Sequence, residues 1–289
     1  MTAHTGDPTA EPPAATFIPG VPLVDRPGVR VLEQPIFARL MGYGPPALLI
    51  HGLAVSGEMY APIAEQLAAN HQLVIPDLPG QGRSASMPGP YSAKRLAEDV
   101  ADLLSQLQMR HATVMGYSQG GPIALQLARD YPDLVGRLIL VCTYAFNMLS
   151  RRERVEGLLT PWMFRIIGPH WIGAIAQHRP AMTGGKPLTT AQAEFVARLI
   201  AETPRAAGAE LAREAMAFDG RHWLADIASP TLVVAGAKDS AVPPHHARML
   251  AQGIAGAVLR EIPDAGHMLI CTHPAELLAI IEDWETSQR

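Results

Sequence analysis

One short run, Gly116-Tyr117-Ser118-Gln119-Gly120, places a serine between two glycines. It follows a strand-like run at residues 112–115 and precedes a helical pattern at residues 122–129. Gly-x-Ser-x-Gly between a strand and a helix is typical of a nucleophilic serine, because the sharp turn needs small neighbours and lifts the hydroxyl off the sheet edge. An ordinary turn is the competing interpretation, but the context makes Ser118 the predicted nucleophile.

A serine hydroxyl needs a neighbouring base, and an imidazole base needs a carboxylate to orient it. Of the 11 histidines, His267 follows the last predicted strand, so it is expected at the same sheet edge as Ser118. Asp239 follows the strand-like run at residues 231–236 and is the predicted acid. Asp264 is the rival, although its closeness to His267 in sequence favours a role in a turn. The order serine, aspartate, histidine is the one that such sheets use.

The run His51-Gly52-Leu53-Ala54 follows another predicted strand. A turn at this point aims a backbone N–H into the site, and we expect the donor to be Leu53, with Ala54 as the second choice. Together with the N–H of Gln119, it forms a predicted two-donor oxyanion hole. His51 itself is expected to be structural.

Short apolar runs alternate with helical patterns over most of the chain, which predicts an α/β fold with a mainly parallel central sheet flanked by helices. Strands are predicted at residues 47–50, 73–75, 112–115, 138–141, 231–236 and 258–262. Helices are predicted at residues 59–70, 94–108, 122–129, 245–252 and 274–285. The stretch 145–225 lacks strand-like runs and predicts an inserted helical cap. The core then comprises 28–144 and 226–289, preceded by a flexible arm at 1–27.

The amino-acid composition argues against several classes of binding partner. The formal net charge of −4 and the lack of a concentrated basic face argue against nucleic acid. No run of apolar residues is long enough to span a membrane, and the arm lacks the features of a secretory signal, so a cytoplasmic protein is expected. Cys142 and Cys271 show no metal-binding or redox spacing. We therefore expect a small-molecule substrate, with no metal or cofactor and no membrane partner; a homodimer is left open.

Taken together, these motifs resemble the α/β-hydrolase fold superfamily in its serine-nucleophile, esterase- and lipase-like branch. The motifs that carry the resemblance are His51-Gly52, Asp77-Leu78-Pro79-Gly80-Gln81-Gly82-Arg83-Ser84, Gly116-Tyr117-Ser118-Gln119-Gly120-Gly121, Asp239 and Gly266-His267. The resemblance implies that Ser118 attacks a carbonyl, His267 takes its proton and Asp239 supports the imidazolium. Water then releases the acyl group, with no metal or cofactor. Members with an aspartate nucleophile are disfavoured, because position 118 is serine.

The resemblance also implies that the cap lines the substrate pocket. Because the cap is rich in Met, Trp, Phe and Ile, a small or medium apolar carboxylic ester is the expected substrate. Tyr117, Met148 and Trp162 are the predicted contacts to it. A C–C bond hydrolase, a lactonase, a thioesterase, a perhydrolase, a proline-type aminopeptidase and a non-enzymatic ligand-binding receptor are the alternatives. An aminopeptidase would need cap acids for the substrate ammonium, and the candidates are Glu153, Glu156, Glu194 and Glu202.

Overall fold

The computed structural model describes residues 22–26, 28–33, 36–170 and 186–288. The arm predicted at residues 1–27 lies almost entirely outside these described residues. Within the described residues, no helix is both long and apolar enough to cross a membrane.

An eight-stranded sheet forms the centre of the molecule, with strand order β1-β2-β4-β3-β5-β6-β7-β8. The pairs β1·β2 and β2·β4 are antiparallel, and every other pair is parallel. The predicted α/β class with a mainly parallel sheet is thereby confirmed. The strands are β1 (Arg30–Leu32), β2 (Ala38–Met41), β3 (Pro46–Ile50), β4 (Gln72–Pro76), β5 (Ala112–Tyr117), β6 (Val135–Val141), β7 (Thr231–Gly236) and β8 (Val258–Ile262).

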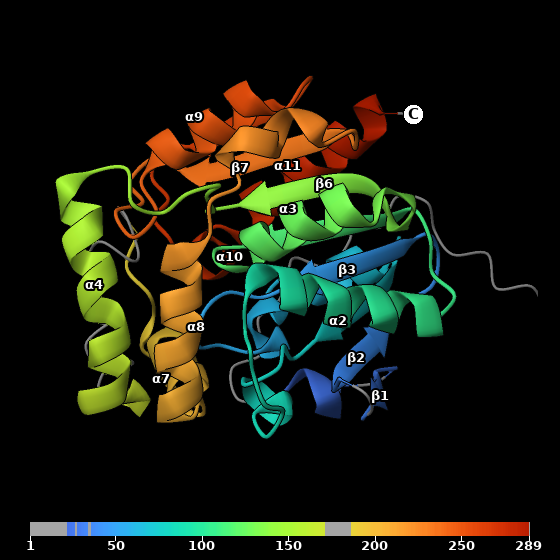
Figure 1. Cartoon of the computed structure of the whole chain (residues 1–289). Helices are drawn as coiled ribbons and strands as arrows, with labels where there is room; N and C mark the ends of the chain where they lie inside the picture. Colours follow the sequence, from blue (N-terminus) through green and yellow to red (C-terminus); the bar gives the residue numbers. More distant parts are fainter. Residues whose placement is uncertain (1–21, 27, 34–35, 171–185, 289) are drawn as a thin grey trace, which may run out of the picture.

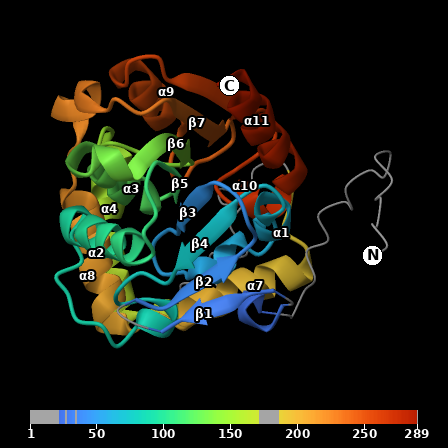
Figure 2. The same ribbon diagram turned by 90° about the vertical axis from the view of Figure 1, so that its right-hand side faces the viewer.

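Helices cover both faces of the sheet (Figure 2). One face carries α2 (Ala93–Gln106), α3 (Gly120–Asp130) and α9 (Pro244–Gly253), and the other carries α1 (Ala64–Ala68) and α11 (Pro274–Ser287). Successive side chains of a strand point to opposite faces, so Leu48 enters one hydrophobic core and Leu49 the other. This two-sided burial explains why the parallel strands are continuous apolar runs.

Between β6 and β7 the chain forms the helices α4 (Arg151–Ile166), α7 (Thr190–Ala201) and α8 (Arg205–Ala217). They form a separate layer beside the core, in which α4 packs along α8 (Figure 1). Glycines allow the close approach: a Cβ on Gly208 would lie 2.6 Å from the Phe164 ring. Ser150 and Thr189 begin α4 and α7 with capping boxes, which satisfy free backbone N–H groups.

The structure differs from the predicted elements in three places. β1 and β2 were not predicted: β1 is a short, largely exposed strand, and in β2 Arg39 interrupts the apolar run while being only 2% exposed. Its guanidinium binds Glu58 and Asp77, each at 2.7 Å, and this pairing makes burial of the charge tolerable. The predicted helix 59–70 is instead η2 (Gly57–Tyr60) followed by the short α1. Finally, β5 continues to Tyr117, and α3 begins at Gly120, which leaves Pro122 in its first turn.

The remaining short elements connect these parts. They are η1 (Leu23–Asp25), η3 (Gly82–Ser84), η4 (Pro132–Leu134), η5 (Arg221–Asp226) and α10 (Leu269–Thr272).

Candidate active site

Ser118 occupies a strained turn between β5 and α3. Its φ of 53° lies in the left-handed region, which is uncommon for a residue with a side chain. The flanking glycines make the turn possible: a Cβ on Gly116 would lie 2.6 Å from the Gly120 carbonyl oxygen, and one on Gly120 would collide with the Ile50 carbonyl oxygen. Such strain is typical of functional positions, and it directs the serine away from the sheet.

The ends of three parallel strands bring Ser118, Asp239 and His267 together. The Ser118 Oγ lies 3.0 Å from the His267 Nε2, and the His267 Nδ1 lies 2.8 Å from the Asp239 Oδ2. The other carboxylate oxygen of Asp239 accepts the N–H groups of Ala241 at 2.9 Å and Val242 at 2.8 Å. Because the carboxylate can only accept, Nδ1 carries the ring proton, which leaves Nε2 free to take the serine proton.

The rival acid Asp264 lies elsewhere. Its carboxylate is 72% exposed and binds Lys238 at 2.6 Å, and this ion pair lowers the pKa of Asp264. Of the two candidate carboxylates, the structure therefore brings Asp239, and not Asp264, to His267.

The predicted oxyanion donors lie on the two loops that flank Ser118. Gln119 stands at the N-terminus of α3, where backbone N–H groups are unpaired. Among the described residues, neither the Leu53 N–H nor the Gln119 N–H donates to a protein acceptor. The second choice, Ala54, donates its N–H to the Gln81 Oε1 at 2.6 Å and is thus occupied. Leu53 and Gln119 remain the predicted pair.

Tyr117 is placed beneath the site. Its side chain is buried, and its hydroxyl donates to the His267 carbonyl oxygen at 2.7 Å. The two rings are 5.3 Å apart, and burial raises the pKa of Tyr117 well above its ordinary value. The polar atom of Tyr117 is used to hold His267, and its contact to substrate stays a prediction.

The two predicted cap contacts are not brought to the triad either. Trp162 is 56% exposed, and it points away from α8 because it lies half a helical turn from the buried Phe164. This outward position does not support the prediction that Trp162 binds substrate, which stays a prediction. Met148 packs beside α4, where a Cβ on Gly157 would lie 3.5 Å from its sulfur. Nothing in that packing links Met148 to a substrate.

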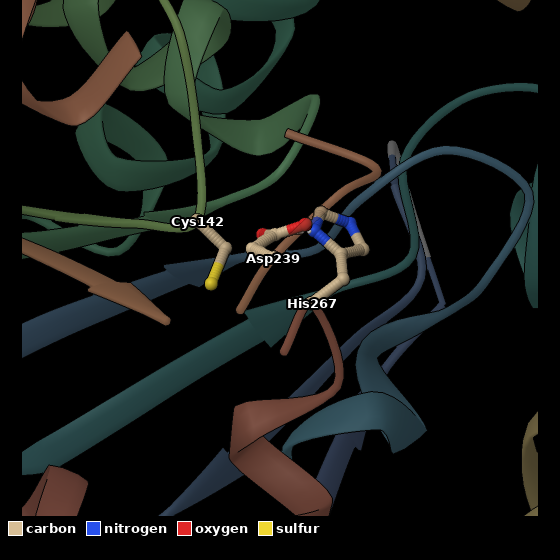
Figure 3. A group of neighbouring side chains, drawn as sticks. All are labelled: Cys142, Asp239 and His267. Atoms are coloured by element: carbon tan, nitrogen blue, oxygen red, sulfur yellow. Dashed lines mark hydrogen bonds and ion pairs between the residues drawn. The ribbon is translucent and has the colours of Figure 1, made fainter. Parts of the chain in front are cut away.

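Thr143 and Cys142, at the end of β6, were not predicted as parts of the site. The Thr143 hydroxyl donates to the Ser118 carbonyl oxygen at 2.5 Å and so supports the strained turn. Figure 3 shows the Asp239 carboxylate between the Cys142 thiol and the His267 ring. Burial raises the pKa of the Cys142 thiol well above its ordinary value, so it stays protonated. The sequence spacing did not indicate either residue, because only the pairing of β6 with β5 and β7 brings them to the site.

Each described cap helix is hydrogen-bonded to the core close to the site. The Gln119 Nε2 donates to the Leu211 carbonyl oxygen of α8 at 3.0 Å, and the Gln192 Nε2 of α7 donates to the Cys271 carbonyl oxygen at 2.7 Å. From α4, the Glu153 Oε1 lies 3.0 Å from the His246 Nε2. The cap is therefore held at three points around the triad.

Glu153 is buried between the first turns of α4 and α9. Its Oε2 accepts the Ser150 N–H at 2.6 Å, and its Oε1 also lies 2.9 Å from the His245 Nε2. Burial opposes ionisation, but the Ser150 N–H and His246 outweigh it and lower the pKa of Glu153. Burial also lowers the pKa of His246, so the contact joins a carboxylate to a neutral imidazole.

Two groups of described side chains have the composition of a metal site: Cys142, Asp239 and His267, and Glu153, His245 and His246. The first contains a protonated thiol and a carboxylate already bonded to imidazole. The second lies between two helix N-termini, which favour an anion over a cation. Neither group gives reason to change the expectation that the chemistry uses no metal.

His51 holds the loop after β3 in place. Its Nε2 accepts the Leu78 N–H at 3.0 Å, and its Nδ1–H donates to the Gly52 carbonyl oxygen at 2.9 Å. Burial lowers the pKa of His51 to about 4, so the ring is neutral near pH 7. It contributes structure rather than a proton.

The fold and the site together define an α/β hydrolase. The family model for the alpha/beta hydrolase fold matches residues 45–274, and the chain belongs to this family. Among similar curated proteins, the magnesium-chelatase 30 kDa subunit of Rhodobacter capsulatus is 32% identical over 83% of this chain and 87% of its own length. A pimeloyl-[acyl-carrier protein] methyl ester esterase of Chromobacterium violaceum is 29% identical over 87% of this chain and 98% of its own. A solved esterase from Thermogutta terrifontis has a TM-score of 0.75 and 25% identity, covering 90% of this chain and 98% of that one.

Proposed function

We propose that the protein is a serine hydrolase that cleaves carboxylic esters through an acyl-enzyme. The observation that carries the proposal is the unbroken hydrogen-bond chain from the Ser118 Oγ through His267 to Asp239, with contacts of 3.0 and 2.8 Å. The Ser118–His267 distance falls within the range in which a base accepts a proton directly, and the His267–Asp239 distance is that of an ordinary hydrogen bond.

In the acylation step, the Ser118 Oγ forms a bond to the ester carbonyl carbon while its proton passes to the His267 Nε2. Asp239 stabilises the resulting imidazolium, and the Leu53 and Gln119 N–H groups stabilise the negative oxygen. The tetrahedral intermediate expels the alcohol, which receives the proton from His267. Water, deprotonated by the same Nε2, then attacks the acyl-enzyme and releases the acid.

The substrate is proposed to be a small or medium ester with an apolar part. Esters are the easiest acyl donors for this machinery, and two of the similar proteins are named esterases. Of the four cap acids that could bind a substrate ammonium, the buried Glu153 is bound to His245 and His246. The other three, Glu156, Glu194 and Glu202, are exposed. This favours an ester over the substrate of an aminopeptidase.

Labelling with a fluorophosphonate probe tests the nucleophile. We expect wild-type protein to be labelled and Ser118→Ala not to be, while Ser105→Ala, an exposed serine of α2, serves as the matched control. A folded wild-type protein that resists the probe would refute the proposal and favour a non-catalytic role. That outcome matters because one similar protein is named as a magnesium-chelatase subunit.

A panel of p-nitrophenyl esters from acetate to laurate then tests the substrate class. We expect turnover with the shorter chains and none with a proline arylamide. Hydrolysis of the arylamide, of a lactone or of a vinylogous diketone with all esters inert would move the assignment to the aminopeptidase, lactonase or C–C hydrolase alternative.

A further inference from the structure

The loop after β4 is bonded at three places to the loop that carries the predicted oxyanion donor Leu53. The Leu78 N–H donates to the His51 ring at 3.0 Å, and the Gly57 N–H donates to the Asp77 Oδ1 at 2.8 Å. Between these outer contacts, the Ala54 N–H donates to the Gln81 Oε1 at 2.6 Å. The middle contact is one peptide unit from the Leu53 N–H.

Ala54 adopts a conformation that its own side chain disfavours. Its φ of 54° lies in the left-handed region, and the residue is fully enclosed. An alanine stays in this region only where its surroundings constrain the backbone, and the Gln81 contact to its N–H is one such constraint. The Ala54 N–H belongs to the peptide unit that follows Leu53, so the Gln81 contact fixes that unit, and only the φ and ψ of Leu53 separate it from the unit that carries the Leu53 N–H.

Gln81 is itself constrained by burial and by the turn in which it lies. It has no exposed surface, and it lies between Gly80 at φ 80° and Gly82 at φ 52°. The Gly82 turn is close to the neighbouring loop, since a Cβ there would lie 2.7 Å from the Ser56 Cβ. The backbone N–H of Gln81 donates to the Leu78 carbonyl oxygen at 3.0 Å. A side chain on such a rigid turn can position another loop.

The carboxamide orientation follows from its partner. An N–H donor requires an acceptor, so the oxygen of Gln81 must face Ala54 and the NH₂ group must face the other way. Among the described residues, the Gln81 Nε2 is buried and has no hydrogen-bond partner. The orientation of the carboxamide is therefore set by the bond to Ala54 and not by a protein partner of the NH₂ group.

We propose that Gln81 is a positioning residue of the oxyanion hole: its side-chain oxygen holds Ala54 in the left-handed conformation and thereby aims the Leu53 N–H at the reacting carbonyl. The inference rests on the proposed hydrolase function and extends it to a residue that touches no catalytic side chain. Any acyl substrate that uses Ser118 would depend on this contact equally.

The test combines amide hydrogen exchange with kinetics on p-nitrophenyl butyrate. Gln81→Met keeps the volume and removes the acceptor, so we expect faster exchange at the Ala54 amide and a kcat lower by about 10- to 100-fold with little change in KM. That loss is smaller than the ~10²–10³-fold typical for deleting a whole donor, because the Leu53 N–H remains but is misaimed. Gln126→Met removes another buried glutamine, bonded to Asp130 at 2.6 Å on α3, and should leave both readouts unchanged.

Gln81→Glu provides a second variant that retains the acceptor. We expect Ala54 to stay protected from exchange, while the new charge near the developing oxyanion lowers kcat at neutral pH. The ratio of variant to wild-type kcat should rise as the pH falls and the carboxylate is protonated.

The inference is overturned if Gln81→Met leaves the Ala54 exchange rate unchanged, or if exchange accelerates while kcat stays at the wild-type value. It is also overturned if the Gln81→Glu ratio is independent of pH. The exchange measurement needs no activity: a wild-type protein that is inert to esters and to fluorophosphonate would refute the proposed hydrolase, while the exchange rates still report whether Gln81 holds the loop.

Discussion

Replacing Asp239 by asparagine changes one atom of the candidate triad and little of its shape. In the wild-type protein, the Asp239 Oδ2 accepts the His267 Nδ1–H at 2.8 Å, and its Oδ1 accepts two backbone N–H groups. An asparagine oxygen would keep the two backbone bonds, because those donors admit only an acceptor. Its NH₂ group would then face His267 and force Nδ1 to accept. The ring proton moves to Nε2, which can no longer take the serine proton.

Two losses determine the size of the fall in kcat: His267 no longer has the correct tautomer, and the imidazolium no longer has the negative charge of Asp239 beside it. A loss of about 10⁴-fold in kcat is expected for this substitution in a serine–histidine–aspartate site, which corresponds to ~5.5 kcal/mol in the activation free energy. The free energy of unfolding should change far less, by about 1–2 kcal/mol, because the two backbone contacts to Asp239 persist. A large kinetic loss without a large loss of stability is the signature of a catalytic carboxylate.

The assay compares p-nitrophenyl butyrate turnover and thermal unfolding for Asp239→Asn and for Asp264→Asn. The second variant removes an exposed carboxylate that pairs with Lys238, so its kcat should stay within about twofold of wild type. If Asp264→Asn proved the more damaging, or if Asp239→Asn retained a tenth of the activity, the assignment of the acid would fail.

Three further variants test other parts of the structure. The folded pKa of His51 is about 4, below an unfolded value near 6.5, so its contribution to stability is complete above pH 6.5 and is lost as the pH falls toward 4. At pH 5 that loss is ~2 kcal/mol. The variant His51→Gln still accepts the Leu78 N–H but cannot be protonated, so its Tm should fall less than the wild-type Tm between pH 7 and pH 5. Equal falls in Tm would contradict this. Because the pKa of Glu153 is lowered, its contacts stabilise the protein above its unfolded value of about 4.5 and fade as the pH falls through the folded value. Glu153→Gln should therefore increase proteolysis of the cap at pH 7 more than at pH 4, and a pH-independent increase would count against the contact. A Cβ on Gly121 would collide with the Thr143 hydroxyl, so Gly121→Ala should lower the free energy of unfolding by about 1–3 kcal/mol in urea titration; a neutral result would show that the Ser118 turn tolerates more crowding than the structure implies.

The sheet and the triad were predictable because both depend on local signals. Most of the parallel strands contain a continuous apolar run, such as Leu232 to Ala235 in β7, and the candidate catalytic residues follow strands at the same edge of the sheet. The antiparallel strands β1 and β2 were not predictable in the same way. In β2 the charged Arg39 is buried beside Asp77 and Glu58, and both partners lie well outside the strand in sequence. A prediction based only on residues nearby in sequence therefore treats such a charged residue as exposed.

Local signals also could not assign Gln81 and Thr143. Each of these roles is defined by one contact between loops at the ends of different strands, such as the Ala54 N–H to the Gln81 Oε1 or the Thr143 hydroxyl to the Ser118 carbonyl oxygen. The sequence shows that these loops exist at the catalytic edge, but the direction of a side chain within a loop depends on its neighbours across the sheet.

The cap shows most clearly why composition is a poor guide to a pocket. α4 carries apolar side chains on opposite faces: Phe164 is buried against α8, whereas Leu158 and Trp162 are exposed on the outer face. Both faces of α4 carry apolar residues, so the local sequence does not show which of them pack in the core, which are exposed to solvent and which contact a substrate. Besides apolar packing, three polar contacts fix the cap, namely those of Glu153 with His246, of Gln192 with Cys271 and of Gln119 with Leu211. Since Gln119 also supplies a predicted oxyanion donor, a shift of α8 would be felt at the reacting carbonyl, and the cap therefore bears on how the site reacts.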